Sequence, residues 1–190
     1  MATKFKHCKR YNDAGHAHEL TFTCFKYQPF LAKDRARNWL AEAIILARRK
    51  HLFHVWAYVF MPEHVHLLIC PTTTQYDVSS ILATIKLSVT RKALNHVKQF
   101  APRFLPRMAD VQPNGDIHYR FWQRGGGYDR NSTEPTTIWK QIDYIHLNPV
   151  RRGFCERPEE WYWSSAGVYL GLHGGPISID KESLPRTPQG

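Results

Sequence analysis

The pattern of hydrophobic and polar positions predicts short strands that alternate with longer helices along this chain. Four segments are rich in the β-branched, aromatic and alternating apolar residues that are typical of strands. They are residues 19–25, 53–60, 64–70 and 118–123. Three segments carry apolar residues at helical spacing, and they begin near Asp34, near Asp77 and at Ser132 or Thr133. The last helix is expected to end near Asn148, because a proline disfavours helical geometry in the residue before it.

This order of elements predicts an α+β fold of the ferredoxin-like, split β-α-β type with an antiparallel sheet. Two helices would cover one face of the sheet, and a C-terminal helix that bears a tyrosine would follow the fourth strand. The glycines at 125–127 are interpreted as a hinge that lets this last helix pack against the sheet. We expect a basic, flexible N-terminus at residues 1–16, one domain at residues 17–170 and a flexible tail at residues 171–190.

Basic side chains are in strong excess, with 26 Lys and Arg against 16 Asp and Glu in 190 residues. The net charge of +10 favours an anionic partner, nucleic acid first and an acidic membrane surface second. No apolar stretch approaches the length of a membrane-spanning helix, and the first residues lack the apolar region of a signal peptide. These features predict a cytoplasmic location with association to the nucleoid through DNA.

The four cysteines lie far apart and form no CxxC pair, which argues against a zinc knuckle and favours reduced thiols. They are Cys8, Cys24, Cys70 and Cys155.

The segment from Val78 to Ala109 contains no acidic residue but several basic ones. A run of one charge is usually a solvated helix face, but the length of this one favours contact with phosphates. Trp122 and Trp163 could stack on exposed bases, although such aromatic residues are more often part of the core. The candidate DNA-binding residues are Lys86, Arg91, Lys92, Lys98, Arg124, Arg151 and Arg152.

The sequence His64-Val65-His66 lies inside a predicted strand. Side chains alternate between the faces of a strand, so both histidines point to one face and Val65 points to the other. Two imidazoles on one face offer two ligands to one metal ion. A strand in the core has little other reason to carry two titratable rings on one face.

The last helix presents a polar face beside an isoleucine-rich one. Gln141, Tyr144 and Asn148 share the polar face at positions i, i+3 and i+7. His146 lies two residues after Tyr144, about 200° round the helix, and should point away from that face. Taken alone, a tyrosine in this position is more often a half-buried packing residue than a catalytic one.

Three segments together resemble the HUH superfamily of single-strand DNA nucleases and transposases, in which two histidines flank a hydrophobic residue. The segments are Met61-Pro62-Glu63-His64-Val65-His66-Leu67-Leu68, Phe121-Trp122-Gln123 and Asp143-Tyr144-Ile145-His146-Leu147-Asn148-Pro149-Val150. Within this superfamily the chain resembles the REP-associated tyrosine transposases. Arg151-Arg152-Gly153 and Trp161-Tyr162-Trp163-Ser164-Ser165 extend the resemblance, which covers residues 15–170.

The resemblance implies a metal-dependent enzyme that cleaves and rejoins single-stranded DNA beside hairpins formed by palindromic repeats. Tyr144 would be the nucleophile and would form a 5′-phosphotyrosine intermediate. His64, His66 and Asn148 would hold Mg²⁺ or Mn²⁺, with the asparagine as an amide-oxygen ligand. Many relatives carry glutamine at the position of Asn148, and asparagine is shorter by one methylene group. The resemblance leaves a monomer and a homodimer open.

Two other functions are compatible with parts of this pattern. Ferredoxin-like sheets with exposed aromatic residues also form non-catalytic modules that bind single-stranded DNA or RNA. The chain lacks the aromatic-rich strand signature of RNA-recognition domains, which weakens that alternative. A replication initiator or relaxase of the same superfamily is weaker still, because those enzymes commonly carry further domains.

Overall fold

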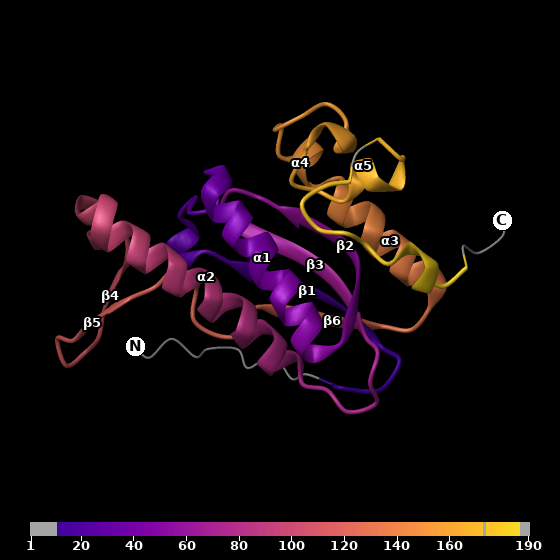
Figure 1. The fold of residues 1–190 in the computed structure, drawn as a ribbon, viewed down its shortest axis with the longest axis horizontal. Helices are drawn as coiled ribbons and strands as arrows, with labels where there is room; N and C mark the ends of the chain where they lie inside the picture. Colours follow the sequence, from indigo (N-terminus) through magenta and orange to yellow (C-terminus); the bar gives the residue numbers. More distant parts are fainter. Residues whose placement is uncertain (1–10, 173, 187–190) are drawn as a thin grey trace.

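The computed structural model describes residues 11–172 and 174–186, and its centre is a four-stranded sheet (Figure 1). The strands are β1 (Ala17–Thr23), β2 (Phe53–Phe60), β3 (His64–Pro71) and β6 (Tyr128–Ser132). Their order in the sheet is β2-β3-β1-β6, and each neighbouring pair is antiparallel. This order is the ferredoxin-like one, so the predicted fold class is confirmed.

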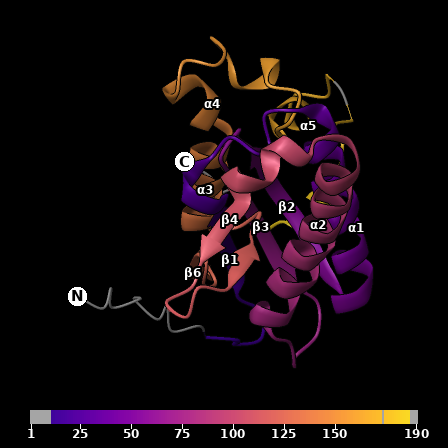
Figure 2. The same ribbon diagram turned by 90° about the vertical axis from the view of Figure 1, so that its left-hand side faces the viewer.

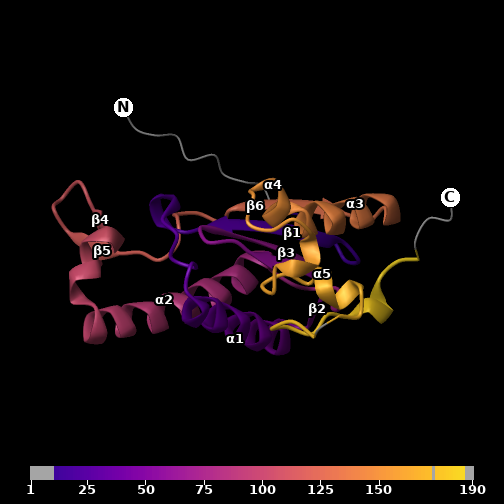
Figure 3. The ribbon, with the colours of Figure 1, turned by 90° about the horizontal axis from the view of Figure 1, so that it is seen from above.

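Helices cover both faces of the sheet and give the molecule three layers. Helices α1 (Asp34–His51) and α2 (Val78–Phe100) lie on one face, and α3 (Pro135–His146) lies on the other (Figure 3). The same arrangement is visible from the side, with the strands between α1 and α2 on one hand and α3 on the other (Figure 2). Asp77 caps α2 by accepting hydrogen bonds from the amides of Ser79 and Ser80 at 2.9 and 3.0 Å.

The alternation of side chains along the strands builds two separate apolar cores. On the α1 and α2 side, the core includes Phe22, Val65, Leu67, Leu40, Ile44, Ile81 and Ile85. On the α3 side, a smaller core joins Ala57, Val59 and Leu68 to Ile138, Ile142 and Ile145. This smaller core leaves the rest of its sheet face available for polar side chains. Trp122 and Trp163 are buried in the larger core, which is the more common role for such residues.

The fourth strand of the sheet differs from the predicted one. Residues 117–119 form β5 (Ile117–Tyr119), which pairs only with β4 (Ala109–Val111) in a small hairpin. The sheet instead takes β6, whose sequence is Tyr-Asp-Arg-Asn-Ser. A polar edge strand has one neighbour and little buried surface, so it carries no alternating apolar signal. Residues 121–122 are apolar because they fill the core before the chain reaches β6.

The β4–β5 hairpin lies at the opposite end of the molecule from α3 (Figure 1). Beyond α3 the chain forms two short helices, α4 (Asn148–Arg151) and α5 (Ala166–Tyr169). Short 3-10 helices complete the described chain at η1 (Phe25–Tyr27), η2 (Pro102–Met108), η3 (Pro158–Glu160) and η4 (Lys181–Ser183). Within the described residues, none of the helices has the length and apolar character needed to cross a membrane.

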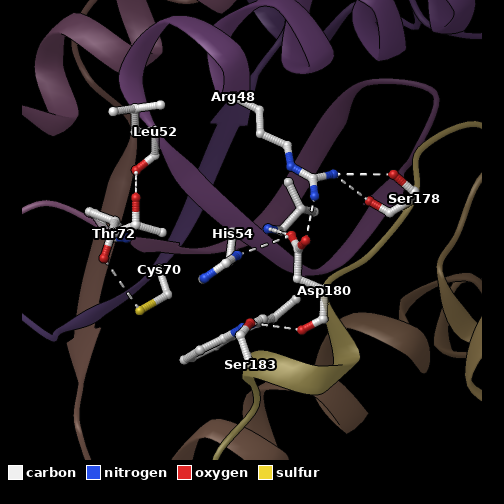
Figure 4. Close-up of polar contacts among 11 residues, drawn as sticks. Arg48, Leu52, His54, Cys70, Thr72, Ser178, Asp180 and Ser183 are labelled. Atoms are coloured by element: carbon white, nitrogen blue, oxygen red, sulfur yellow. Dashed lines mark hydrogen bonds and ion pairs between the residues drawn. The ribbon is translucent and has the colours of Figure 1, made fainter.

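The C-terminal segment packs along the outer edge of β2, whereas the sequence predicted a flexible tail. The Asp180 amide donates to the Val55 carbonyl at 2.9 Å, and the Val55 amide donates to the Asp180 carboxylate at 2.8 Å. The carboxylate also pairs with Arg48 and lies 3.6 Å from His54 (Figure 4). The Trp56 indole donates to the Ser183 hydroxyl at 2.8 Å. These polar groups satisfy an edge strand, and polar contacts of this kind have no hydrophobic period to reveal them.

Candidate active site

His64 and His66 lie side by side on the α3 face of the sheet. Their ring centroids are 5.0 Å apart and the rings are nearly perpendicular, at 83°. Val65 between them is fully buried in the opposite core, as the alternation along the strand requires. Both histidines are on β3, a central strand held by neighbours on either side, so the backbone that carries them is firmly positioned.

Each histidine ring is oriented by a hydrogen bond to its Nδ1 atom. Thr21, which pairs with His66 across the β1–β3 ladder, places its hydroxyl 2.9 Å from His66 Nδ1. The Glu63 carboxylate lies 3.1 Å from His64 Nδ1 and also accepts a hydrogen bond from Arg152. Among the described residues, neither Nε2 atom has a hydrogen-bond partner. With the proton on Nδ1, both Nε2 lone pairs are available, which is the usual state of metal-binding histidines.

Burial keeps both imidazoles neutral at neutral pH. It lowers the pKa of His66 to about 3, with a smaller contribution from the neighbouring His64. Burial also lowers the pKa of His64, although the Glu63 carboxylate opposes this shift. A metal ion binds the neutral form of imidazole, so neither ring would have to lose a proton before binding one.

Tyr144 comes from α3 and reaches the histidine pair from across the layer. Its ring meets that of His66 edge-on, with centroids 5.6 Å apart and an angle of 84° between the planes. The Tyr144 side chain is 43% exposed, so a large ligand could approach its hydroxyl. The Arg151 guanidinium lies 5.0 Å from the centre of the same ring. The three isoleucines of α3 that pack on the sheet set the rotation of the helix and therefore the direction of Tyr144.

Asn148 begins α4, one turn beyond Tyr144. Its Nδ2 group donates to the Tyr144 carbonyl at 2.8 Å, and its Oδ1 atom has no hydrogen-bond partner among the described residues. The amide oxygen is therefore the free end of this side chain. His146 points elsewhere and forms a 2.8 Å hydrogen bond with the Ser165 hydroxyl.

The donor atoms at this site fit a divalent metal ion. The two imidazole Nε2 atoms form a nitrogen pair, which suits Mn²⁺ better than Mg²⁺. The side-chain contact recorded for Asn148 is with the Tyr144 carbonyl, so the structure does not itself bring the amide oxygen to the histidine pair. The described part of the chain contains no group of three or more His, Cys, Asp or Glu side chains that could hold a metal.

A recess of about 790 Å³ extends from His66 and Tyr144 along α3 and β6. Sequence reasoning did not assign a role to most of its lining residues. They are Glu19, Thr21, Tyr128, Arg130, Thr137, Lys140 and Gln141. Two signals were available in the sequence: Gln141 shares a helix face with Tyr144, and Glu19 shares a strand face with Thr21. Burial raises the pKa of Glu19, and the nearby Arg130 and Gln141 partly offset this shift.

The predicted DNA-binding residues are spread over two layers. Lys86, Arg91, Lys92 and Lys98 belong to α2, on the side of the sheet opposite the histidines. Within this group Lys92 pairs with Glu42, and Lys86 donates to the Gly125 carbonyl at 2.9 Å.

Near the β4–β5 hairpin, Arg124 pairs with Asp110 at 3.0 Å. Arg151 and Arg152 alone in the predicted set contact the Tyr144 ring or the carboxylate that holds His64.

Comparison with known proteins places these features in context. A family model described as "Transposase IS200 like" matches residues 16–109, which include the histidine strand but end before Tyr144. A protein of Haemophilus influenzae is 24% identical over 140 residues, covering 70% of this chain and 74% of the relative. A protein of Escherichia coli K12 is 27% identical over 126 residues, covering 66% of this chain and 62% of the relative. Both are named as REP-associated tyrosine transposases.

The fold also matches a solved structure of a REP-associated tyrosine transposase bound to a REP hairpin. The TM-score is 0.67 with 21% sequence identity, and the match covers 98% of this chain and all of the other. At this level of identity the likeness concerns the fold.

Proposed function

We propose that this chain is a member of the IS200-like transposase family and that it cleaves and rejoins single-stranded DNA near hairpin repeats through a 5′-phosphotyrosine intermediate on Tyr144. The observation that carries this proposal is the meeting of Tyr144 with the histidine pair. The Tyr144 ring lies edge-on to His66 at 5.6 Å, and the Nε2 atoms of both histidines are without hydrogen-bond partners in the described part of the chain.

His64 and His66, together with the Asn148 amide oxygen, are the residues that would hold the metal ion. When bound, Mg²⁺ or Mn²⁺ would polarise the scissile phosphate and offset the negative charge that builds up on it. Thr21 and Glu63 fix the two rings, so their Nε2 atoms keep their directions while DNA enters and leaves.

The Tyr144 hydroxyl supplies the nucleophile. Its oxygen forms a bond to the scissile phosphorus while the bond from phosphorus to the 3′-oxygen breaks. The phenol proton ends on the departing 3′-oxygen, so no water is consumed and the 5′-phosphate stays linked to the enzyme. Because the phosphodiester energy is kept in that link, a 3′-hydroxyl from the same or another strand can reverse the step. Arg151 beside the Tyr144 ring places a positive charge next to the incoming phosphate.

We propose hairpin-forming DNA repeats as the partner. The net charge of +10 favours a polyanion, and a solved relative of the same fold is described as bound to a REP hairpin. A function on chromosomal DNA would place the protein in the cytoplasm with the nucleoid.

The test is a covalent capture experiment with Mn²⁺ and single-stranded hairpins from repeats that flank the gene. Each hairpin is prepared in two versions, one labelled at the 3′ end and one at the 5′ end. Denaturing gels should show the 3′ label migrating with the protein, because a 5′-phosphotyrosine retains the 3′ fragment. The 5′ label should appear on a shorter free strand. EDTA should prevent both products.

Two variants separate catalysis from folding and binding. Tyr144→Phe should abolish the adduct and leave hairpin binding within about twofold, because only the hydroxyl is lost. Tyr162→Phe, which changes an exposed tyrosine outside the site, should form the adduct at the wild-type rate. An adduct that persists in Tyr144→Phe would contradict the assignment of Tyr144 as the nucleophile. Tight binding with no adduct on any hairpin would instead favour a non-catalytic binding module.

A further inference from the structure

The recess beside Tyr144 is larger than a metal ion and a phosphate require. Its volume of about 790 Å³ is in the range of sites that enclose a small organic ligand. Its walls come from β1, β3, β6, α3 and α4. Three basic side chains line it, Arg130, Lys140 and Arg151, against the single carboxyl group of Glu19. A cavity of this size and charge suits part of an anionic chain, and it begins at the proposed nucleophile.

Gln141 is a polar group of this recess that the proposed reaction does not use. Its side chain is 3% exposed, and neither Oε1 nor Nε2 makes a hydrogen bond of normal geometry among the described residues, although the amide lies close enough to the Glu19 carboxyl group to lower the pKa of that group. A buried amide that makes no hydrogen bond is unfavourable, and such groups are uncommon in folded proteins. The amide lies one helical turn before Tyr144 on the same face of α3, so its free donor and acceptor line the recess close to the reacting centre.

Glu19 lies beside this amide on the floor of the recess. It pairs with Arg130 across the β1–β6 ladder, and its carboxylate is 3.9 Å from His66 Nδ1. A carboxylate next to an arginine offers acceptors only. Gln141 and Glu19 together therefore present amide donors and several acceptors to a ligand in the recess.

Given the proposed function, we infer that this recess holds the base of a nucleotide next to the scissile phosphate, and that Gln141 and Glu19 select adenine or cytosine over guanine or thymine. Adenine and cytosine each carry an amino group beside a ring nitrogen acceptor. The Gln141 oxygen can accept one amino hydrogen while its nitrogen donates to the ring nitrogen. Glu19 can accept the second amino hydrogen.

Thymine and guanine place a carbonyl oxygen where adenine and cytosine place the amino group. The Gln141 amide could rotate by about 180° and pair with the carbonyl edge of thymine or guanine. The Glu19 carboxylate would then face the carbonyl oxygen of the base, and neither group could donate a hydrogen bond to the other. Glu19 thus decides the preference, and Gln141 supplies most of the pairing. Arg130 and Lys140 are placed to neutralise the phosphates on either side of the bound nucleotide.

The test measures binding of the tetranucleotides dA4, dC4 and dT4 to the full chain in EDTA, so that no cleavage occurs. Dissociation constants for wild type should be about tenfold or more lower for dA4 and dC4 than for dT4, as one bidentate pair provides. In parallel, NMR spectra of the ¹⁵N-labelled protein follow the side-chain amide of Gln141. Its signal is identified by its loss in Gln141→Met, and it should shift with dA4 and dC4 but not with dT4.

Gln141→Met keeps the length of the side chain and removes both hydrogen-bonding groups. It should lower the affinity for dA4 to that for dT4, whereas the matched change Gln99→Met, on an exposed position of α2, should change nothing. Glu19→Gln should raise the affinity for dT4. The difference in dissociation constant between dA4 and dT4 should therefore become smaller in this variant as well. The variant provides an independent reading should Gln141→Met fold poorly.

The outcomes separate this inference from the proposed function. Equal affinity of wild type for all three tetranucleotides, or a preference that survives both Gln141→Met and Glu19→Gln, overturns the base recess even where hairpins form the tyrosine adduct. A preference that these variants abolish supports the recess, and it does so whether or not an adduct forms on any hairpin. Only the absence of the adduct bears on the cleavage proposal.

Discussion

Gly127 brings the backbone leading into β6 against the backbone of β1. Substitution of this glycine by alanine adds one methyl group and tests how closely the two backbones approach. Its φ of +77° lies in the left-handed region, and a Cβ atom added there would be 2.1 Å from the Thr21 carbonyl oxygen. Gly125 has a similar φ of +87° but no atom within 4 Å of an added Cβ. The pair Gly127→Ala and Gly125→Ala therefore separates backbone strain from steric contact.

The expected costs follow from these two geometries. Gly125→Ala introduces only left-handed strain, about 1–2 kcal/mol of unfolding free energy. Gly127→Ala adds a clash with main-chain atoms that no rotamer change relieves, about 1–3 kcal/mol more. A protein of this size loses about 2–4 °C in melting temperature per kcal/mol. Gly125→Ala should thus melt about 2–8 °C below wild type, and Gly127→Ala about 4–20 °C below it.

Thermal and urea unfolding followed by circular dichroism give both values. The strand movement that relieves the clash also displaces Thr21, whose hydroxyl orients His66. Calorimetric titration with Mn²⁺ should therefore show weaker binding by Gly127→Ala, by about tenfold or more, with no change in Gly125→Ala. Equal melting temperatures for the two variants would show that β6 does not approach β1 this closely and would refute the reasoning.

Two further predictions concern residues away from the proposed chemistry. Burial lowers the pKa of His146 to about 4. Between about pH 6.5 and about pH 4, the unfolded chain therefore binds a proton at this imidazole and the folded protein does not. Stability should fall as the pH drops from about 6.5 to about 4, by up to about 3 kcal/mol from this group, and His146→Gln should flatten that slope in urea titrations; an unchanged slope would contradict this. Asp180→Asn weakens the pairing with Arg48 beside the edge of β2, at a cost of about 1–3 kcal/mol. Proteolysis after residue 170 should accelerate in this variant, and a wild-type cleavage rate would argue against the contact.

The elements with strong hydrophobic periods were predicted correctly from sequence. The histidine strand follows from strict alternation around Val65, and the placement of His64 and His66 on one face required nothing else. The tyrosine helix follows from its isoleucine spacing, whereas its end does not follow from Pro149: α3 ends at His146, and Asn148, the residue before Pro149, begins α4. These are segments in which burial against a core dictates the residue types, and burial is what a periodic pattern records.

Two segments are held by polar contacts that no hydrophobic period records. The edge strand β6 contains Asp, Arg, Asn and Ser, and its partner is chosen by main-chain hydrogen bonds that any sequence can form. The C-terminal segment is held by Asp180, whose partners lie more than 100 residues away in the chain. No local pattern encodes such distant pairings, so a polar strand and a polar tail look alike before folding.

The recess beside Tyr144 illustrates a second kind of limit. Gln141 is on the same helix face as Tyr144 and Asn148, so its position could be predicted, but its lack of a partner could not. That property depends on β1 and β6 meeting α3, two strands that contribute Glu19 and Arg130 from opposite sides of one ladder. A methionine at position 141 would fill the same volume without leaving an amide unsatisfied. The glutamine is thus a choice that packing alone would not favour, and a ligand that completes both hydrogen bonds supplies the physical reason for it.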